Sequence, residues 1–196
     1  MPKPARTETG SAIGPDARKM VRVWDLFVRA FHWCLALSFV VAWFTSHSSE
    51  DVHHLAGYAA AALVAVRVIW GVIGTHYARF AQFTRGPRTV ANYLKAIATG
   101  REARYIGHNP AGGAMVLTLM RVMAATAGSG WMMTTDQFWG VEWVTKAHDW
   151  IAHGLLLLVL VHLAGVLLAS VRHRENLVGS MVTGRKRSPE AGDVAD

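Results

Sequence analysis

Long apolar runs alternate with polar connections along the chain. At about 1.5 Å per residue, a helix of about 20 apolar residues crosses the hydrocarbon core of a bilayer. The apolar residues here are continuous and do not alternate with polar ones, which is typical of helices surrounded by lipid. The runs cover residues 24–44, 53–74, 111–133 and 146–171. We therefore expect an all-α fold, an integral membrane four-helix bundle.

The connections between these runs differ in length. Residues 75–110 form the longest polar segment, and residues 90–98 within it are predicted to form a surface helix. Asn109 followed by Pro110 is typical of an N-cap and a first helical position, so the third span should begin there. An even number of spans places both termini on one side of the membrane.

Basic residues indicate which side that is. Six Lys and Arg residues lie before residue 30, six between residues 79 and 104, and five after residue 171, whereas only Lys146 lies on the opposite side. Cytoplasmic loops carry such an excess, so both termini and the middle loop are expected in the cytoplasm. This distribution explains the net charge of +7 without a nucleic-acid partner. The expected location is an inner (cytoplasmic) membrane, which the chain crosses several times.

The same patterns divide the chain into parts. Residues 1–20 are rich in Pro, Gly and charge and lack the apolar core of a signal peptide, so we expect a flexible tail. Residues 21–175 should form the transmembrane domain and residues 176–196 a cytoplasmic C-terminal tail. The single cysteine, Cys34, excludes an internal disulfide, an iron-sulfur cluster held by this chain alone, and haem attached through a Cys-x-x-Cys-His motif.

The last apolar run carries histidines at positions that suit haem. His148 and His162 are fourteen residues apart, so at about 100° per residue they project from nearly the same face, about 21 Å apart along the axis. This separation is too large for one metal ion. It suits two haems stacked along a helix bundle, each needing one more axial ligand from another helix.

Other spans supply those ligands. His32 lies about 12 Å into the first span, at the depth of His162, so these two can share an inner haem. His53 opens the second span and His148 the fourth, both from the outer side, so they can share an outer haem. Two histidines remain alternatives for the outer pair: His54 and His153.

Further residues near the haem levels have expected roles. Arg67 lies at the inner level, where its guanidinium needs an anion, either a haem propionate or Asp25. Gly57 follows His53 by one turn, and its missing side chain would let a porphyrin approach the backbone. A second intramembrane cation, Arg121, lies in the third span. The remaining histidines near span ends are interpreted as interfacial polar residues: His47, His76, His108 and His173.

Several fragments of the sequence combine into a recognisable set. They are WDLFVRAFHW, HHLAGY followed by RVIWG, GHNPAGG, the histidine pair of the fourth span and RENLVGSMVTGRK. Together they resemble the bacterial cytochrome b561 family, which includes the b-type cytochrome subunits that anchor nickel-iron hydrogenases. The resemblance covers residues 20–187. It implies a membrane cytochrome that holds two noncovalent b haems through four axial ligands: His32, His53, His148 and His162.

Three functions remain open. The first is electron transfer between quinone and a periplasmic c-type cytochrome, hydrogenase or dehydrogenase, by a subunit without catalytic residues of its own. The second is a stand-alone superoxide:quinone oxidoreductase, an activity of one branch of the family. It would favour cations at the outer haem, where Lys146 faces several acids. The third is a histidine-lined metal or proton transporter, which would need carboxylates in the spans.

Residue types at the two levels suggest where each reaction takes place. Near the inner haem, Asp25, Arg29, Arg67 and the GHNP turn would offer a proton-accessible carboxylate, cations and a helix N-terminus to quinone. The outer level is aromatic and acidic, which suits a protein partner. We therefore expect quinone at the cytoplasmic side and the redox partner at the periplasmic side.

Overall fold

The computed structural model describes residues 20–194. In this part of the chain, four helices are long and apolar enough to cross a membrane: α1 (Leu26–Thr45), α2 (Glu50–Ile73), α5 (Pro110–Met133) and α6 (Glu142–Arg172). The expected all-α membrane bundle is therefore confirmed. The tail expected over residues 1–20 lies, apart from Met20, outside the described residues, and the side of the membrane that holds the termini remains a prediction.

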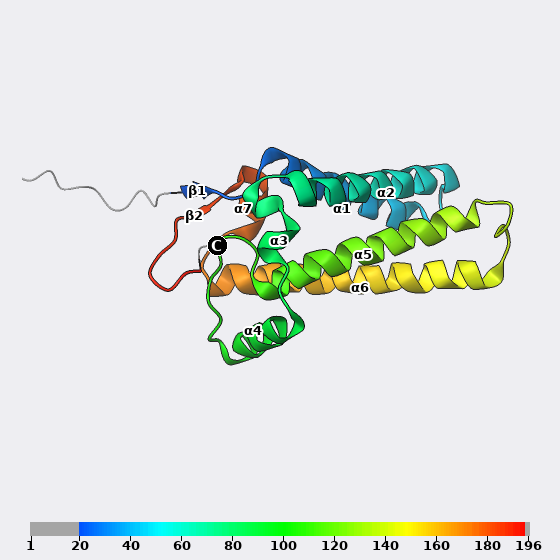
Figure 1. Ribbon diagram of the computed structural model, residues 1–196. Coiled ribbons are helices and arrows are strands. Elements are labelled where there is room, and N and C mark those ends of the chain that lie inside the picture. Colours follow the sequence, from blue (N-terminus) through cyan, green and yellow to red (C-terminus); the bar gives the residue numbers. More distant parts are fainter. Residues whose placement is uncertain (1–19, 195–196) are drawn as a thin grey trace, which may run out of the picture.

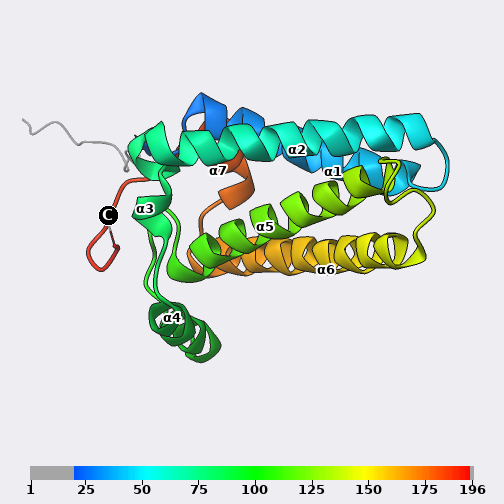
Figure 2. The same cartoon turned by 45° about the vertical axis from the view of Figure 1, so that its right-hand side comes forward.

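The four spans form two antiparallel hairpins that lie side by side (Figures 1 and 2). Helix α1 packs along α2, α5 packs along α6, and α2 also contacts α5. We call the end with the two hairpin connections, residues 46–49 and 134–141, the loop end. The opposite end, toward which the chain returns after each hairpin, is the basic end. Buried apolar side chains join the hairpins midway: Ala60, Val64, Met120, Met123 and Leu155.

Side-chain caps fix where two of the spans begin. Asp25 precedes α1 and accepts a hydrogen bond from the amide of Val28 at 2.7 Å. Asn109 precedes α5 and accepts one from the amide of Gly112 at 2.7 Å, with Pro110 at the first helical position. Both side chains satisfy an amide that has no partner within its helix. The start of the third span predicted from Asn109 and Pro110 is confirmed.

The outer surface of the spans is apolar. Phe44, Trp150 and Val171 are 76%, 79% and 77% exposed, and further leucines and valines on α1, α2 and α6 are also exposed. A protein in water would bury most of this surface. Because hydrocarbon tails are as apolar as these side chains, the exposed surface suits lipid contact along the length of the bundle.

Short elements cover the basic end. They are η1 (His76–Ala78), α3 (Phe80–Phe83), α4 (Pro87–Thr99), α7 (Leu177–Thr183), and the strands β1 (Met20–Arg22) and β2 (Arg185–Arg187), which pair antiparallel. Helix α4 is the predicted surface helix; it lies beside the ends of the spans, contacts α5 and accepts a hydrogen bond from Arg172 of α6 at the carbonyl of Ile97 (Figure 2). The segment expected as a C-terminal tail therefore folds back through α7 and β2 onto the ends of the spans.

One buried arginine holds this end together. Arg104 is 5% exposed and donates two hydrogen bonds to the carboxylate of Glu175, at 2.7 and 3.2 Å. It also pairs with Asp193 and donates to the carbonyl of Arg187 at 2.9 Å. The guanidinium thereby joins the α4–α5 connection to the segment after α6, to β2 and to the end of the described chain. Bidentate pairing of this kind is the strongest geometry available to arginine.

Replacing Arg104 with Leu should release the C-terminal segment. Glu175 would keep a buried charge without its partner, a change that costs about 3–5 kcal/mol. Hydrogen exchange should accelerate at residues 185–187 and Val194 but not in the middle of α2. Arg101→Leu, which changes an exposed residue beside it, is the control. Equal protection in both variants would show that Arg104 does not hold this end.

The same ion pair gives a pH dependence. Burial alone would raise the pKa of Glu175, but hydrogen bonds from Arg104 and from the amide of Arg187 outweigh it and hold the pKa below its ordinary value of 4.5. A carboxyl with a depressed pKa stabilises the folded state above its unfolded pKa. Protection of residues 185–187 should therefore be full at neutral pH and be lost as the pH falls below 4.5.

Candidate functional site

A cavity of about 690 Å³ lies between the four spans near the loop end. Its volume is typical of cofactor sites. Helices α1, α2, α5 and α6 all line it, and most of the lining is apolar. Five histidines line it: His47 from the α1–α2 connection, His53 and His54 from α2, and His148 and His153 from α6.

Two of these imidazoles face each other. The ring centres of His53 and His148 are 6.2 Å apart, and the ring planes are at 84°. Imidazole nitrogen binds metal ions at about 2 Å, so two imidazoles on opposite sides of one metal ion have ring centres about 6 Å apart. The observed separation therefore fits axial ligation of a single iron by both residues.

Backbone carbonyls orient both rings. Nδ1 of His53 lies 2.8 Å from the carbonyl oxygen of Ala42 on α1. Nδ1 of His148 lies 3.1 Å from the carbonyl oxygen of Thr126 on α5 and 3.1 Å from the hydroxyl of Ser129. A carbonyl only accepts, so Nδ1 carries the proton in each ring and Nε2 keeps a free lone pair. This is the arrangement found in metal-ligating histidines.

The two rival histidines are held differently. Nδ1 of His153 lies 2.7 Å from the carbonyl oxygen of Asp149, one turn earlier on its own helix, and its side chain is exposed. Nε2 of His54 lies 4.0 Å from the carboxylate of Glu50. The ring of His153 contacts that of Trp43 on α1, with centroids 5.4 Å apart, but in residues 20–194 no hydrogen bond from another helix orients the ring of His54 or His153. The geometry favours His53 and His148.

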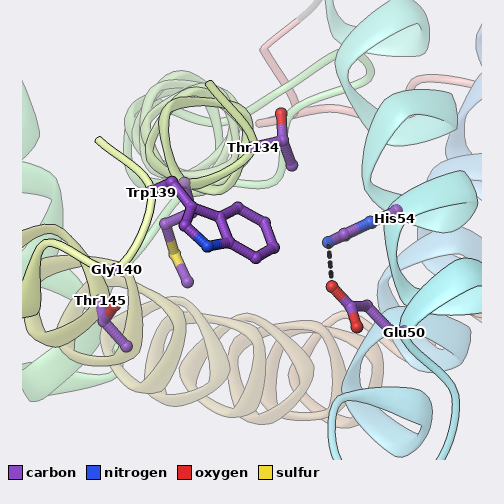
Figure 3. Close-up of a pocket in the computed structure, with 7 residues that line it drawn as sticks. Glu50, His54, Thr134, Trp139, Gly140 and Thr145 are labelled. Carbon is purple, nitrogen blue, oxygen red and sulfur yellow. Dashed lines mark ion pairs between the residues drawn. The ribbon is translucent and has the colours of Figure 1, made fainter. Parts of the chain in front are cut away.

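A smaller pocket of about 280 Å³ adjoins this site at the loop end (Figure 3). Trp139 and Thr134 face the ion pair of Glu50 and His54 across it. The two spaces share four lining residues, Glu50, His54, Met133 and Thr134. The outer level is therefore close to the surface of the loop end.

Glycines make room beside the histidines. Gly57 lines the large cavity, and a Cβ atom added there would meet no atom within 4 Å. A Cβ at Gly130 would lie 3.1 Å from Cε1 of His148. The cavity therefore has room for a flat ring beside Gly57, whereas Gly130 leaves room for the imidazole of His148 itself.

The second predicted pair lies nearer the basic end. His32 on α1 and His162 on α6 are close enough to interact electrostatically. Nδ1 of His32 is shielded from solvent and has no hydrogen-bond partner in the described chain. No group of three or more metal-ligating side chains occurs in residues 20–194. Each predicted site therefore offers a pair of imidazoles, a donor set that would suit a haem.

Arg67 is buried beside this inner pair. It is 2% exposed, and its guanidinium stacks on the rings of Phe80 and Phe31, with its carbon 5.1 and 5.9 Å from their centroids. One Nη donates to the carbonyl of Ala78 at 2.9 Å, whereas the other is shielded and has no partner in the described part. A buried donor of this kind suits an anionic group such as a propionate.

Asp25 does not serve as a free carboxylate. One oxygen caps α1, and the other accepts hydrogen bonds from Trp70 at 3.2 Å and from Thr75. Burial alone would raise its pKa, but these bonds and the nearby Arg67 outweigh that effect and lower the pKa below its ordinary value. The expectation that Asp25 offers a free, proton-accessible carboxylate is therefore wrong. Its hydrogen bonds instead link the start of α1 to the end of α2.

Arg29 and His108 also differ from expectation. Arg29 donates to the carbonyl of Val182 and fastens α7 to α1. The interpretation of His108 as an interfacial residue is wrong, because its ring packs between Trp24 and Phe83 with centroids 4.7 and 4.6 Å away. Burial and the nearby cations lower the pKa of His108 to about 3, so the ring is neutral. The only feature of the sequence that could have indicated this packing is the position of His108 directly before Asn109, the N-cap of α5.

Comparison with known proteins gives a consistent result. The family described as prokaryotic cytochrome b561 matches residues 23–184. A protein of Cupriavidus necator, named "Probable Ni/Fe-hydrogenase B-type cytochrome subunit", is 24% identical over 223 aligned residues, which cover 91% of this chain and 91% of that protein. No solved structure matches.

Filling the cavity at Gly57 tests the outer site. Gly57→Leu places a side chain where the flat ring is expected, so the purified variant should hold about half the haem of the unchanged protein, measured by absorbance per chain. The control is Gly154→Leu, because Gly154 is exposed on α6, does not line the cavity, and has no atom near its added Cβ. Full haem content in both variants would place the cofactor elsewhere.

Proposed function

The chain belongs to the prokaryotic cytochrome b561 family, and we propose that it is a dihaem cytochrome that transfers electrons between a periplasmic redox partner and the quinone pool. The family implies a membrane protein that binds haem b and takes part in electron transfer. The facing pair of His53 and His148, with each Nδ1 anchored to a neighbouring helix, is the observation that carries the proposal.

Four histidines hold the two cofactors in this proposal. His53 and His148 ligate the outer haem, and His32 and His162 ligate the inner one. Bound haem iron supplies one-electron chemistry, whose potential depends on axial ligation and burial. The protein fixes the imidazole orientations through Ala42 and Thr126, and the apolar cavity walls limit access of water. Two levels along the bundle allow electrons to cross the membrane.

The direction across the membrane follows from charge. The basic end carries the Lys and Arg clusters, which supports a cytoplasmic assignment. The loop end would then face the periplasm of a bacterial inner membrane. Exposed aromatic side chains there, including Trp139 at 70% and Trp143 at 60%, suit the membrane interface.

The loop end is also where we expect the redox partner to dock. The small pocket, which shares His54 with the haem cavity, brings the outer level close to this surface. Acidic residues there would complement a basic patch on a c-type cytochrome, hydrogenase or dehydrogenase: Glu50, Asp51, Asp136 and Glu142. The Cupriavidus necator relative is named as a hydrogenase subunit, which supports a partner of this class.

Quinone is proposed to react near the inner level. Arg67 has a shielded donor without a partner in the described chain, and the neutral ring of His108 lies within electrostatic range of both Arg67 and His162. These groups are polar, buried and close to the lipid-embedded part of the bundle. They replace Asp25 and Arg29, whose contacts are structural, as the residues we assign to this site.

The loop end does not favour the alternative, a stand-alone superoxide:quinone oxidoreductase. Lys146 pairs with Glu142 at 2.6 Å, and Glu50 lines the small pocket that leads inward. An anion would meet negative charge on this route. We therefore assign the outer level to a protein donor or acceptor.

Ligand substitution tests the pairing by depth. The purified protein should hold two b haems per chain, both extracted by acidified acetone because no covalent attachment motif exists. His162→Ala should remove the inner haem, and His53→Ala the outer one, each leaving one haem with a distinct reduced-minus-oxidised spectrum. His153→Ala should keep both. Loss of the same haem from the His162 and His53 variants would contradict the pairing.

Arg67→Gln tests the quinone assignment. The variant removes the donor that lacks a partner, so oxidation of the inner haem by a soluble quinone should slow about tenfold, a loss of about 1.4 kcal/mol. Reduction of the outer haem by a donor added at the loop end should be unchanged. Stopped-flow absorbance measures both steps, with Arg88→Gln on α4 as the control. If reduction by the donor slowed while the reaction with quinone did not change, the assignment of the two reactions to the two ends of the bundle would be reversed.

A further inference from the structure

Arg121 is exposed at the middle of α5, on the side facing away from the haem cavity. The residues of α5 that line the cavity are Met123, Thr126, Ala127, Gly130, Trp131 and Met133. At about 100° per residue, their mean direction is about 180° from that of Arg121. The side chain therefore points out of the bundle, and an anion within the cavity cannot neutralise it.

The depth of Arg121 makes this exposure costly. It is eleven residues from Pro110 and twelve from Met133, so about 17 Å of helix separates it from either end of the span. Arginines near span ends can extend their charge into the headgroup region, but one at the midpoint is too far from both. Arg121 has no hydrogen bond or ion pair with any residue in the described range 20–194.

The surface around Arg121 consists mainly of small residues. Eight residues of α5 lie within about 60° of it on the helix, and five of them are small: Ala114, Thr118, Ala124, Ala125 and Gly128. The other three are Pro110, Leu117 and Met132. Small side chains let the backbones of two membrane helices approach closely, and polar groups then stabilise the contact. The face therefore combines room for a second helix with a charge that needs a partner.

We propose that this face of α5 binds a transmembrane helix of a partner protein, and that an Asp or Glu at mid-membrane depth in that helix pairs with Arg121. We choose an acidic partner because the positive charge of Arg121 needs an anion at the same depth. A guanidinium and a carboxylate form the strongest geometry for a charge-assisted pair, and lipid tails offer no alternative. The inference goes beyond the proposed electron transfer and does not depend on haem ligation.

A second copy of the chain fits this face less well. The carboxylates in the spans as described are Glu50, Asp51 and Glu142 in first helical turns, and Asp149 one residue after His148. The ring of His148 contacts Thr126 and Ser129, so Asp149 lies at the depth of those residues. That level is about 10 Å nearer the loop end than Arg121. A symmetric dimer would therefore not align the two charges.

Designed peptides test the pairing. The full-length haem-loaded protein, with an acceptor dye on a C-terminal tag, is placed in phosphatidylcholine vesicles with a donor-labelled transmembrane peptide of leucine and alanine. One peptide carries Glu at its centre and the other carries Gln. Energy transfer should report about tenfold tighter binding of the Glu peptide, in the range that polar contacts add between membrane helices.

Two variants separate this contact from other effects. Arg121→Gln should abolish the preference for Glu while keeping haem content and elution volume unchanged, whereas Arg88→Gln on α4 should keep the preference. Equal binding of both peptides to the unchanged protein would overturn the proposal. Self-association without peptide that is lost in both Arg121→Gln and Asp149→Asn would also overturn it, since a second copy would then be the occupant.

Discussion

Hydrogen bonds from histidine Nδ1 to backbone carbonyls of a neighbouring helix are the contacts on which the outer site depends. A span in lipid has no water with which to satisfy its polar groups, so an imidazole inside the bundle is stabilised by a partner within the protein. His32, whose shielded Nδ1 has no such partner in the described chain, is the exception. His53 uses the carbonyl of Ala42 on α1, and His148 uses that of Thr126 on α5. Each bond ties the two helices of one hairpin together. It also turns Nε2 toward the space between the hairpins, so packing and ligand orientation have the same cause.

At the basic end, buried cations also need partners within the protein. Several cations lie close together there, and most are satisfied by neighbours within the chain. Arg104 is paired with two carboxylates, whereas Arg67 retains a shielded donor without a partner in the described residues. The neutral ring of His108 packs near it without adding charge. Arg104, whose donors are paired, therefore has a structural role, whereas Arg67, which keeps an unpaired donor in the described chain, is the group we assign to the inner site.

Much of the fold could be predicted from the sequence because lipid imposes long apolar runs. The four spans, the start at Pro110, the surface helix α4 and the two depths of histidine all follow from length and helical period. Helical spacing alone does not separate His53 from its neighbour His54, and the preference for His53 in the sequence came from the family resemblance. In the structure, the choice rests on whether a carbonyl of another helix lies within reach, and adjacent histidines have the same local sequence.

The pattern of apolar and polar residues also does not predict the long-range contacts at the basic end. Helix α7 and strand β2 are too short to show a periodic pattern. Arg104 binds Glu175 before α7 and the carbonyl of Arg187 in β2, both more than 70 positions away. His108 and Asp25 have neighbours that only the folded chain brings together. Sequence spacing therefore predicts which residues share a helix face, and tertiary contacts decide which of them are free to act.

Electron paramagnetic resonance of the oxidised protein at low temperature tests the central claim most directly. Two axial histidines make ferric haem low-spin, and the 84° between the rings of His53 and His148 should make the outer signal strongly anisotropic. The account predicts low-spin signals that integrate to two haems per chain. A high-spin signal that integrates to one haem or more would contradict it, because one of the two sites would then lack its second histidine.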